Sequence, residues 1–196
     1  IDLLSQAGIK FIILSPWQCN AVENEEGKII ELGSNPAPYR EPYILTGKRG
    51  GEITAFFYEP SLASGISFGH YLRNADSLYS TLLDIKNRDK SPIIHTATDG
   101  EIYGHHEPYG DMALAALIKK VNDGDDFIFD NYGSYMAKHP ATKHAVLRKG
   151  EEGKGTSWSC SHGVSRWYKD CGCHTGGDEG WNQKWRTGLR NALNNL

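Results

Sequence analysis

The sequence predicts a mixed α/β fold, and three observations favour that class. Short runs of β-branched and aromatic residues alternate with longer stretches whose apolar residues recur every three or four positions. The order strand, helix, strand is typical of parallel βαβ units. The length of 196 residues suits one domain, and the 22 glycines and five tryptophans suit a loop-rich site that stacks a flat or ring-shaped ligand.

Composition and charge argue against several other classes of protein. A formal net charge of −3 and a pI of about 6.2 disfavour a nucleic-acid-binding surface. No apolar run approaches the roughly 18 residues that a membrane-spanning helix needs, and no signal peptide is visible. Four cysteines are too few for a disulfide scaffold. We therefore expect a cytoplasmic protein with reduced thiols and with neither a membrane nor a nucleic-acid partner.

The N-terminal part contains two predicted strands separated by a polar stretch. Residues 1–7 have the apolar spacing of a short helix, which Gly8 is placed to end. Residues 10–14 follow as a buried strand. Residues 23–51 are rich in Glu, Gly, Pro and Asn, so we expect an inserted loop there. Residues 53–58 are β-branched and aromatic and predict the next strand.

Helices and short strands alternate through the middle of the chain. We expect helices at residues 62–86 (with a break near Gly69), 111–121 and 132–138, and strands at residues 92–98 and 127–129. After Gly150 the sequence becomes rich in Trp, Cys, His and Gly, and residues 181–196 predict a final helix.

Because the chain begins in a helix that leads directly into a core strand and ends in an uncapped helix, we expect a fragment that folds poorly when expressed alone.

The strongest candidate for chemistry follows the predicted strand at residues 92–98. A carboxyl group at a strand end, shielded from water by aromatic side chains, can act as a general acid. An alternative is that the two acidic residues of this loop only cap a following helix. The candidate residues, which lie between or beside two glycines, are Asp99, Glu101, Tyr103, His105 and His106.

A second cluster combines thiols and imidazoles. Cys160 and His162 are followed by Cys171, Cys173 and His174, and such side chains bind zinc in many proteins. Their spacings match no ordinary zinc finger, however, and small thiols also pack beneath irregular loops. We therefore expect a reduced structural loop without stoichiometric zinc, and the sequence predicts no metal or cofactor.

Tryptophans offer flat faces on which sugar rings can stack. Trp158 and Trp167 lie in glycine-flanked loops and are the better candidates for such contacts. Trp181 and Trp185 are four residues apart on a predicted helix, which is more typical of core positions. Two further histidines are expected to lie in the interior: His70 and His95.

Several of these segments together resemble one protein family. Residues 98–106 resemble the motif of glycoside hydrolase family 57 that carries the catalytic acid/base aspartate just before a Gly-Glu pair. Residues 158–167, 170–173 and 180–183 resemble a branch of that family with an additional, uncharacterised C-terminal domain. Residues 8–18 resemble a strand of the same branch, so the resemblance covers essentially the whole chain.

The resemblance implies an architecture and an activity. Residues 1–150 would be the C-terminal part of a distorted (β/α)7 barrel, since a complete (β/α) barrel needs roughly 250 residues. Residues 151–196 would be a loop region rich in Trp, Cys and Gly and the start of a helical region. The implied activity is retaining hydrolysis or transglycosylation of an α-glucan-type oligo- or polysaccharide.

The resemblance also implies roles for individual residues. Asp99 would be the general acid/base, and the nucleophile would be a glutamate upstream of Ile1, so the isolated chain should be inactive. The residues that would line the sugar site are Glu101, Tyr103, His105, His106, Trp158, His162 and Trp167.

Two alternatives remain open at the level of sequence. A metal-dependent polysaccharide hydrolase or deacetylase of similar barrel shape would use Asp99, His105 and His106 as ligands. A non-catalytic carbohydrate-binding remnant would hold its ligand through the tryptophans alone.

Overall fold

The strands form one six-stranded sheet of mixed direction. The computed structural model describes residues 1–90, 92–173 and 177–196. The strands are β1 (Phe11–Leu14), β2 (Cys19–Glu23), β3 (Ile29–Glu31), β4 (Tyr43–Thr46), β5 (Glu52–Phe57) and β6 (Lys143–Leu147). Their order in the sheet is β1-β5-β4-β6-β2-β3. Strands β1 and β3 stand at the two ends, so the sheet is open and forms no closed barrel among the described residues.

The directions of the strands only partly follow a βαβ pattern. Strand β1 is parallel to β5, and β4 is parallel to β6. The pairs β4–β5, β2–β6 and β2–β3 are antiparallel. The predicted α/β class is therefore confirmed, while the expectation of consistently parallel units is wrong.

The polar stretch at residues 23–51 is not a simple loop, contrary to our expectation. It contains β3 and β4, and in β4 the side chains of Tyr43 and Leu45 are buried whereas Ile44 and Thr46 are more accessible. This alternation is the period of a strand that buries one face. This strand is only four residues long and is surrounded by prolines and glycines, so the sequence did not predict it.

The helices agree better with the sequence. They are α1 (Asp2–Gln6), α2 (Pro60–Phe68), α3 (Ala75–Asp89), α4 (Gly110–Asp123), α5 (Tyr132–Lys138) and α6 (Trp185–Asn194). Gly8 has φ +80°, a conformation that suits glycine after a helix end. The predicted break near Gly69 separates α2 from α3, where Asn74 accepts hydrogen bonds from the backbone of Asp76 and Ser77.

Two predicted strands, at residues 92–98 and 127–129, are wrong. Residues 92–98 are extended without joining the sheet, although the carbonyl of His95 accepts a hydrogen bond from the backbone N–H of Glu59. Strand β5, which ends just before Glu59, already pairs with β1 on one side and β4 on the other. Strand β4 pairs only with residues 52–55 of β5, and the segment meets the chain beyond that point through the Glu59 hydrogen bond, which does not extend into a ladder. The predicted strand at residues 10–14 exists as β1, but it is the half-exposed edge of the sheet rather than a buried strand.

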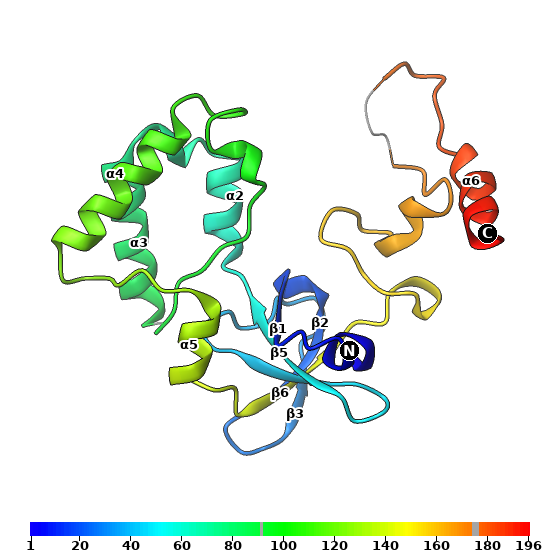
Figure 1. Ribbon diagram of the computed structural model, residues 1–196, viewed down its shortest axis with the longest axis horizontal. Helices are drawn as coiled ribbons and strands as arrows, with labels where there is room; N and C mark the ends of the chain where they lie inside the picture. Colours follow the sequence, from blue (N-terminus) through cyan, green and yellow to red (C-terminus); the bar gives the residue numbers. More distant parts are fainter. Residues whose placement is uncertain (91, 174–176) are drawn as a thin grey trace.

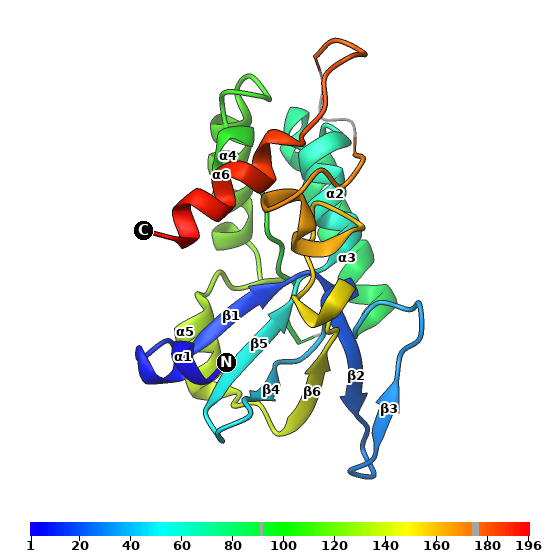
Figure 2. The same ribbon diagram turned by 90° about the vertical axis from the view of Figure 1, so that its right-hand side faces the viewer.

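The apolar side chains form two separate cores. One lies on the sheet and includes Cys19, Tyr43 and Phe57. The other lies among α2, α3 and α4 and includes Leu62, Leu78 and Leu117. Figure 2 shows these three helices gathered above the sheet, with the sheet below. The molecule is thus a sheet layer joined to a helical layer.

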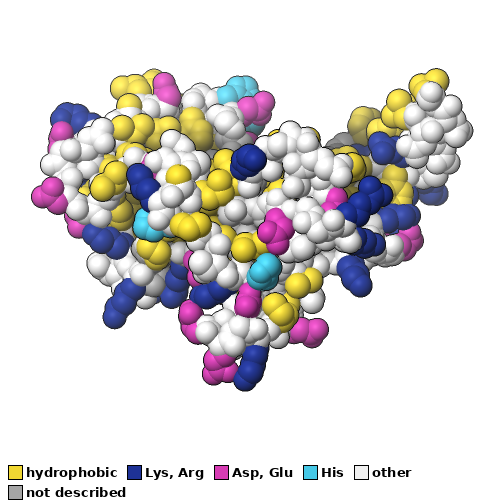
Figure 3. Space-filling view, turned by 60° about the horizontal axis from the view of Figure 1, so that its bottom comes forward, with side chains coloured by type: hydrophobic (Ala, Val, Ile, Leu, Met, Phe, Trp, Pro, Cys, Tyr) yellow, Lys and Arg dark blue, Asp and Glu magenta, His cyan; other side chains and the backbone are white. Residues whose placement is uncertain are grey.

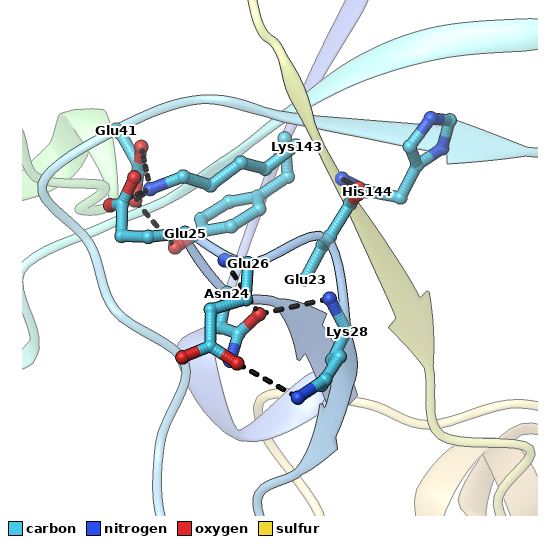
Figure 4. Close-up of polar contacts among 9 residues, drawn as sticks. Glu23, Asn24, Glu25, Glu26, Lys28, Glu41, Lys143 and His144 are labelled. Carbon is cyan, nitrogen blue, oxygen red and sulfur yellow. Dashed lines mark hydrogen bonds and ion pairs between the residues drawn. The ribbon is translucent and has the colours of Figure 1, made fainter.

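Ion pairs hold the late strand β6 against the early part of the chain. The Lys143 ammonium group lies 2.5 Å from a carboxylate oxygen of Glu25 and 2.8 Å from one of Glu41, and these two carboxylates raise the pKa of Lys143. The backbone N–H of His144 donates to Glu23 at 2.8 Å. Figure 4 shows this network at the turn between β2 and β3. It helps to fix strands that are more than a hundred residues apart in sequence.

The segment after Gly150 projects from the rest of the molecule. It runs through short turns to α6, at the right of Figure 1. Figure 3 shows it as an extension with several Lys and Arg side chains where it leaves the body. Among the described residues, no helix is both long and apolar enough to cross a membrane.

Candidate functional site

The Asp99 loop, residues 98–106, is anchored by its backbone and exposes its polar side chains. A single 3-10 turn, Gly100–Ile102, follows Asp99, and the Ile102 side chain is buried in the helical core. Asp99 is exposed and makes no side-chain hydrogen bond to cap this turn. The capping alternative for Asp99 is therefore wrong. We expected this loop to follow a strand of the sheet. It does not, and it lies in the helical layer instead.

The other predicted residues of this loop form three contacts. The Tyr103 hydroxyl lies 3.0 Å from the Thr98 hydroxyl. His106 Nε2 lies 3.1 Å from a carboxylate oxygen of Glu101, and the His105 and His106 ring centroids are 4.7 Å apart. The loop therefore groups carboxylate, phenol and imidazole side chains on one exposed surface, with Glu101 occupied by His106.

One buried carboxylate beside this loop was missed from the sequence. Glu107 is 7% exposed and contacts His70 Nδ1, and it accepts a hydrogen bond from Arg73 Nε at 2.8 Å. The hydrogen bonds from Arg73 and His70 lower the pKa of Glu107. His70, expected in the interior, is instead exposed and pairs with Glu107 across the end of α2. No local pattern in the sequence links these residues, which are 34 and 37 positions apart.

His95 is interior, as expected, and lies next to a cavity. Its Nδ1 is 3.1 Å from the Tyr132 hydroxyl, its Nε2 is buried with no hydrogen-bond partner among the described residues, and burial lowers its pKa to about 4.

The cavity, about 690 Å³, lies between the ends of α3 and α4 and helix α5. Its carboxylates Asp126 and Asp130 are paired with Lys86 and Lys138. Asp99 does not line this cavity. The cavity and the residue predicted to be catalytic therefore lie in different places. Although His95 and Asp125 line the cavity, we give more weight to the exposed carboxylate, because the sequence resemblance names a reacting group there and names none in the cavity.

The predicted tryptophan contacts lie elsewhere. Trp158 and Trp167 are 66% and 54% exposed, as stacking requires. Trp181 and Trp185, expected in the core, are 71% and 60% exposed, so that expectation is wrong. All four belong to the projecting segment, which Figure 1 separates from the Asp99 loop (bright green). The structure therefore does not bring Trp158, His162 and Trp167 next to Asp99.

The thiols and one imidazole of the projecting segment do come together. The ligand atoms of Cys160, His162, Cys171 and Cys173 all lie within 4.8 Å of one another. All four cysteines of the chain are free, and Cys19 lies apart from this group in the sheet. The neighbouring thiols, Cys160 first, raise the pKa of Cys173 to about 11. His174, which also belongs to the sequence cluster, lies outside the described residues.

Comparison of the chain with protein-family models and with curated protein sequences finds no match.

Proposed function

We propose that the chain is part of a retaining glycoside hydrolase or transglycosylase that acts on α-glucan-type polysaccharide, with Asp99 as its general acid/base. What supports the proposal is the family motif together with an accessible Asp99 carboxylate that does not cap the turn it precedes. The expected strand end and the expected shielding from water by aromatic side chains are both wrong, because Asp99 follows no strand of the sheet and is exposed. The resemblance of residues 98–106 to the family motif supplies the reaction class.

The surroundings of Asp99 suit a sugar ligand. Hydroxyl and imidazole groups of Tyr103, His105 and His106 offer hydrogen-bond donors and acceptors on the same loop. In the proposed mechanism Asp99 donates a proton to the glycosidic oxygen as that bond breaks. It then takes a proton from water or from a sugar hydroxyl as the covalent glycosyl-enzyme is released.

Retention of configuration also requires a nucleophilic carboxylate about 5–5.5 Å from the acid/base. The proposal assigns this role to a glutamate outside these 196 residues, as the family resemblance implies. The closed (β/α)7 barrel is likewise part of the proposal. Within the described residues, the extended segment 92–98 leads into Asp99 beside α2 and would become a barrel strand only with further partners.

Of the two alternatives, one is disfavoured and one has an observation in its support. In the part of the chain that the structure describes, the potential metal ligands that gather in one place are Cys160, His162, Cys171 and Cys173. Neither Asp99 nor His105 belongs to this cluster. A metal-dependent hydrolase at the Asp99 loop is therefore disfavoured. The exposure of the four tryptophans in the projecting segment favours carbohydrate binding as a second candidate function.

Kinetics of Asp99→Asn in the full-length protein that contains these residues test the proposal. An acid/base is worth roughly 10²–10⁴ in rate, so turnover of a natural α-glucan should fall by about that factor. Activated aryl glycosides need less protonation of the leaving group, and their glycosylation step should slow less.

Glu101→Gln is the matched control, because Glu101 is an exposed carboxylate two residues away that pairs with His106. Its effect should be smaller and should not depend on the leaving group. Unchanged turnover in Asp99→Asn, together with loss of activity in Glu101→Gln, would contradict the assignment. Glucan binding that persists without any turnover in the wild type would support the binding module instead.

A further inference from the structure

We propose that Cys160, His162, Cys171 and Cys173 form a structural zinc site that stabilises the projecting segment. This inference replaces our expectation of a metal-free loop. It does not depend on the proposed glycosidase activity, because the cluster lies in a different part of the molecule from Asp99.

The distances between the ligand atoms fit a tetrahedron around one zinc ion. Zn–S bonds of about 2.3 Å and Zn–N bonds of about 2.0–2.1 Å give tetrahedral edges of about 3.8 Å between sulfurs and about 3.6 Å between sulfur and nitrogen. Cys160 Sγ lies 4.0 Å from Cys171 Sγ and 3.8 Å from Cys173 Sγ. His162 Nδ1 lies 3.7 Å from Cys160 Sγ and 3.3 Å from Cys173 Sγ. These four of the six separations match the expected edges within a few tenths of an ångström, and the other two lie within 4.8 Å.

Two tight turns present these ligands. The N–H of Gly163 donates to the carbonyl of Cys160 at 3.0 Å, which curls the chain so that Cys160 and His162 face the same point. In the second turn Gly172, with φ +80°, separates Cys171 from Cys173, and its N–H donates to Asp170 Oδ1 at 3.1 Å. Only glycine adopts that φ at little cost, so the intervening residue permits both thiols to point to one side.

Neither a disulfide nor simple burial of thiols accounts for this cluster as well as a metal does. A disulfide would join one pair of sulfurs, but Cys160 is nearly equidistant from Cys171 and Cys173, and all three are free. Simple burial of small thiols does not apply, because of the four residues only Cys160 is buried and His162 is exposed. Three sulfurs and one imidazole nitrogen are soft donors, which select zinc over magnesium or calcium.

The projecting segment has little apolar packing to stabilise it. The large apolar side chains of α6, Trp185, Leu189 and Leu193, are each more than half exposed, and so are Trp158 and Trp167. Within the part of the chain that the structure describes, neither of the two apolar cores includes a residue of this segment. A structural zinc ion supplies folding free energy directly, which is the usual solution where a small region cannot build its own core.

Metal analysis of the protein that contains these residues, purified without chelators and then exposed to zinc sulfate, tests the proposal. Native mass spectrometry and elemental analysis should find one zinc per chain. Cys171→Ser, Cys173→Ser and His162→Ala should lose it. Cys19→Ala is the matched control, because this thiol lies in the sheet, away from the cluster, and its removal should leave the zinc content at one per chain.

Cobalt substitution of the wild type keeps the test decisive if a ligand variant fails to fold. Bound Co²⁺ should show the visible and near-ultraviolet bands of tetrahedral thiolate coordination, and added zinc should remove them. Absence of stoichiometric zinc together with absence of these bands would overturn the proposal. Zinc that the ligand variants retain as fully as the wild type would also overturn it.

Discussion

Replacement of His95 by phenylalanine should make the stability of the fold about 3 kcal/mol less sensitive to acidification between pH 6.5 and pH 4. His95 is 9% exposed, and its ring packs against those of Phe56 and Tyr132, with centroids 5.8 and 5.5 Å away. Burial disfavours the charged imidazolium and lowers the pKa of His95 from 6.5 to about 4. The folded protein therefore keeps this ring neutral over a pH range in which the unfolded chain protonates it.

The magnitude follows from that difference in pKa. Above pH 6.5 both states are neutral and the contribution of His95 to stability is fully present. As the pH falls from 6.5 towards 4, only the unfolded state takes up a proton, at a cost of about 1.36 kcal/mol per pH unit. The wild type should thus lose about 3 kcal/mol across this interval through His95 alone.

Urea denaturation at about pH 7.5 and at about pH 4 measures the effect. His95→Phe keeps an aromatic ring of similar size but cannot titrate, so its free energy of unfolding should fall by about 3 kcal/mol less than that of the wild type. His105→Gln is the control, because His105 is exposed, and it should retain the pH dependence of the wild type. Equal pH dependence in His95→Phe and wild type would refute the reasoning.

Two further substitutions test the helical layer and the sheet. Asn74→Ala should destabilise the protein by about 1 kcal/mol in thermal or urea unfolding. The reason is that Asn74 caps α3 by accepting hydrogen bonds from the N–H groups of Asp76 and Ser77, both at 2.9 Å. No loss of stability would show that this cap is unimportant. Phe56→Ala should cost about 3–5 kcal/mol, because Phe56 is fully buried and packs against Tyr132 of α5 with ring centroids 4.9 Å apart. A cost below about 1 kcal/mol would mean that α5 does not pack on the sheet as described.

The sequence predicts the helices better than the strands, for a physical reason. Helices α3 and α4 carry their own signals, such as Asn74 at one start and Gly124 at one end. A strand depends on a partner that sequence proximity does not specify. Residues 92–98 have the composition of a strand but contact the chain just after β5 without forming a ladder beside it. Strand β4 has strand-forming residues, but it is only four residues long within a stretch rich in Pro and Gly, and it pairs with β5 and β6 on its two sides.

The candidate site shows the same division. The contact between Glu101 and His106 is predictable, because they are neighbours in one loop. The contact of Glu107 with His70 and Arg73 is not, since it depends on how α2 and the loop pack together. The convergence of Cys160 and Cys173 depends on glycine turns whose spacing matches no common zinc motif. Likewise, the exposure of Trp181 and Trp185 depends on the projection of α6 from the rest of the chain.

The most direct test of the central claim is chemical rescue of Asp99→Asn by azide in the full-length protein. Azide attacks the glycosyl-enzyme without needing a general base, so it should restore part of the lost turnover on an activated aryl glycoside. The product should be a glycosyl azide of retained configuration, identified by NMR. Rescue of Glu101→Gln but not of Asp99→Asn, or a glycosyl azide of inverted configuration, would contradict Asp99 as the acid/base of a retaining enzyme.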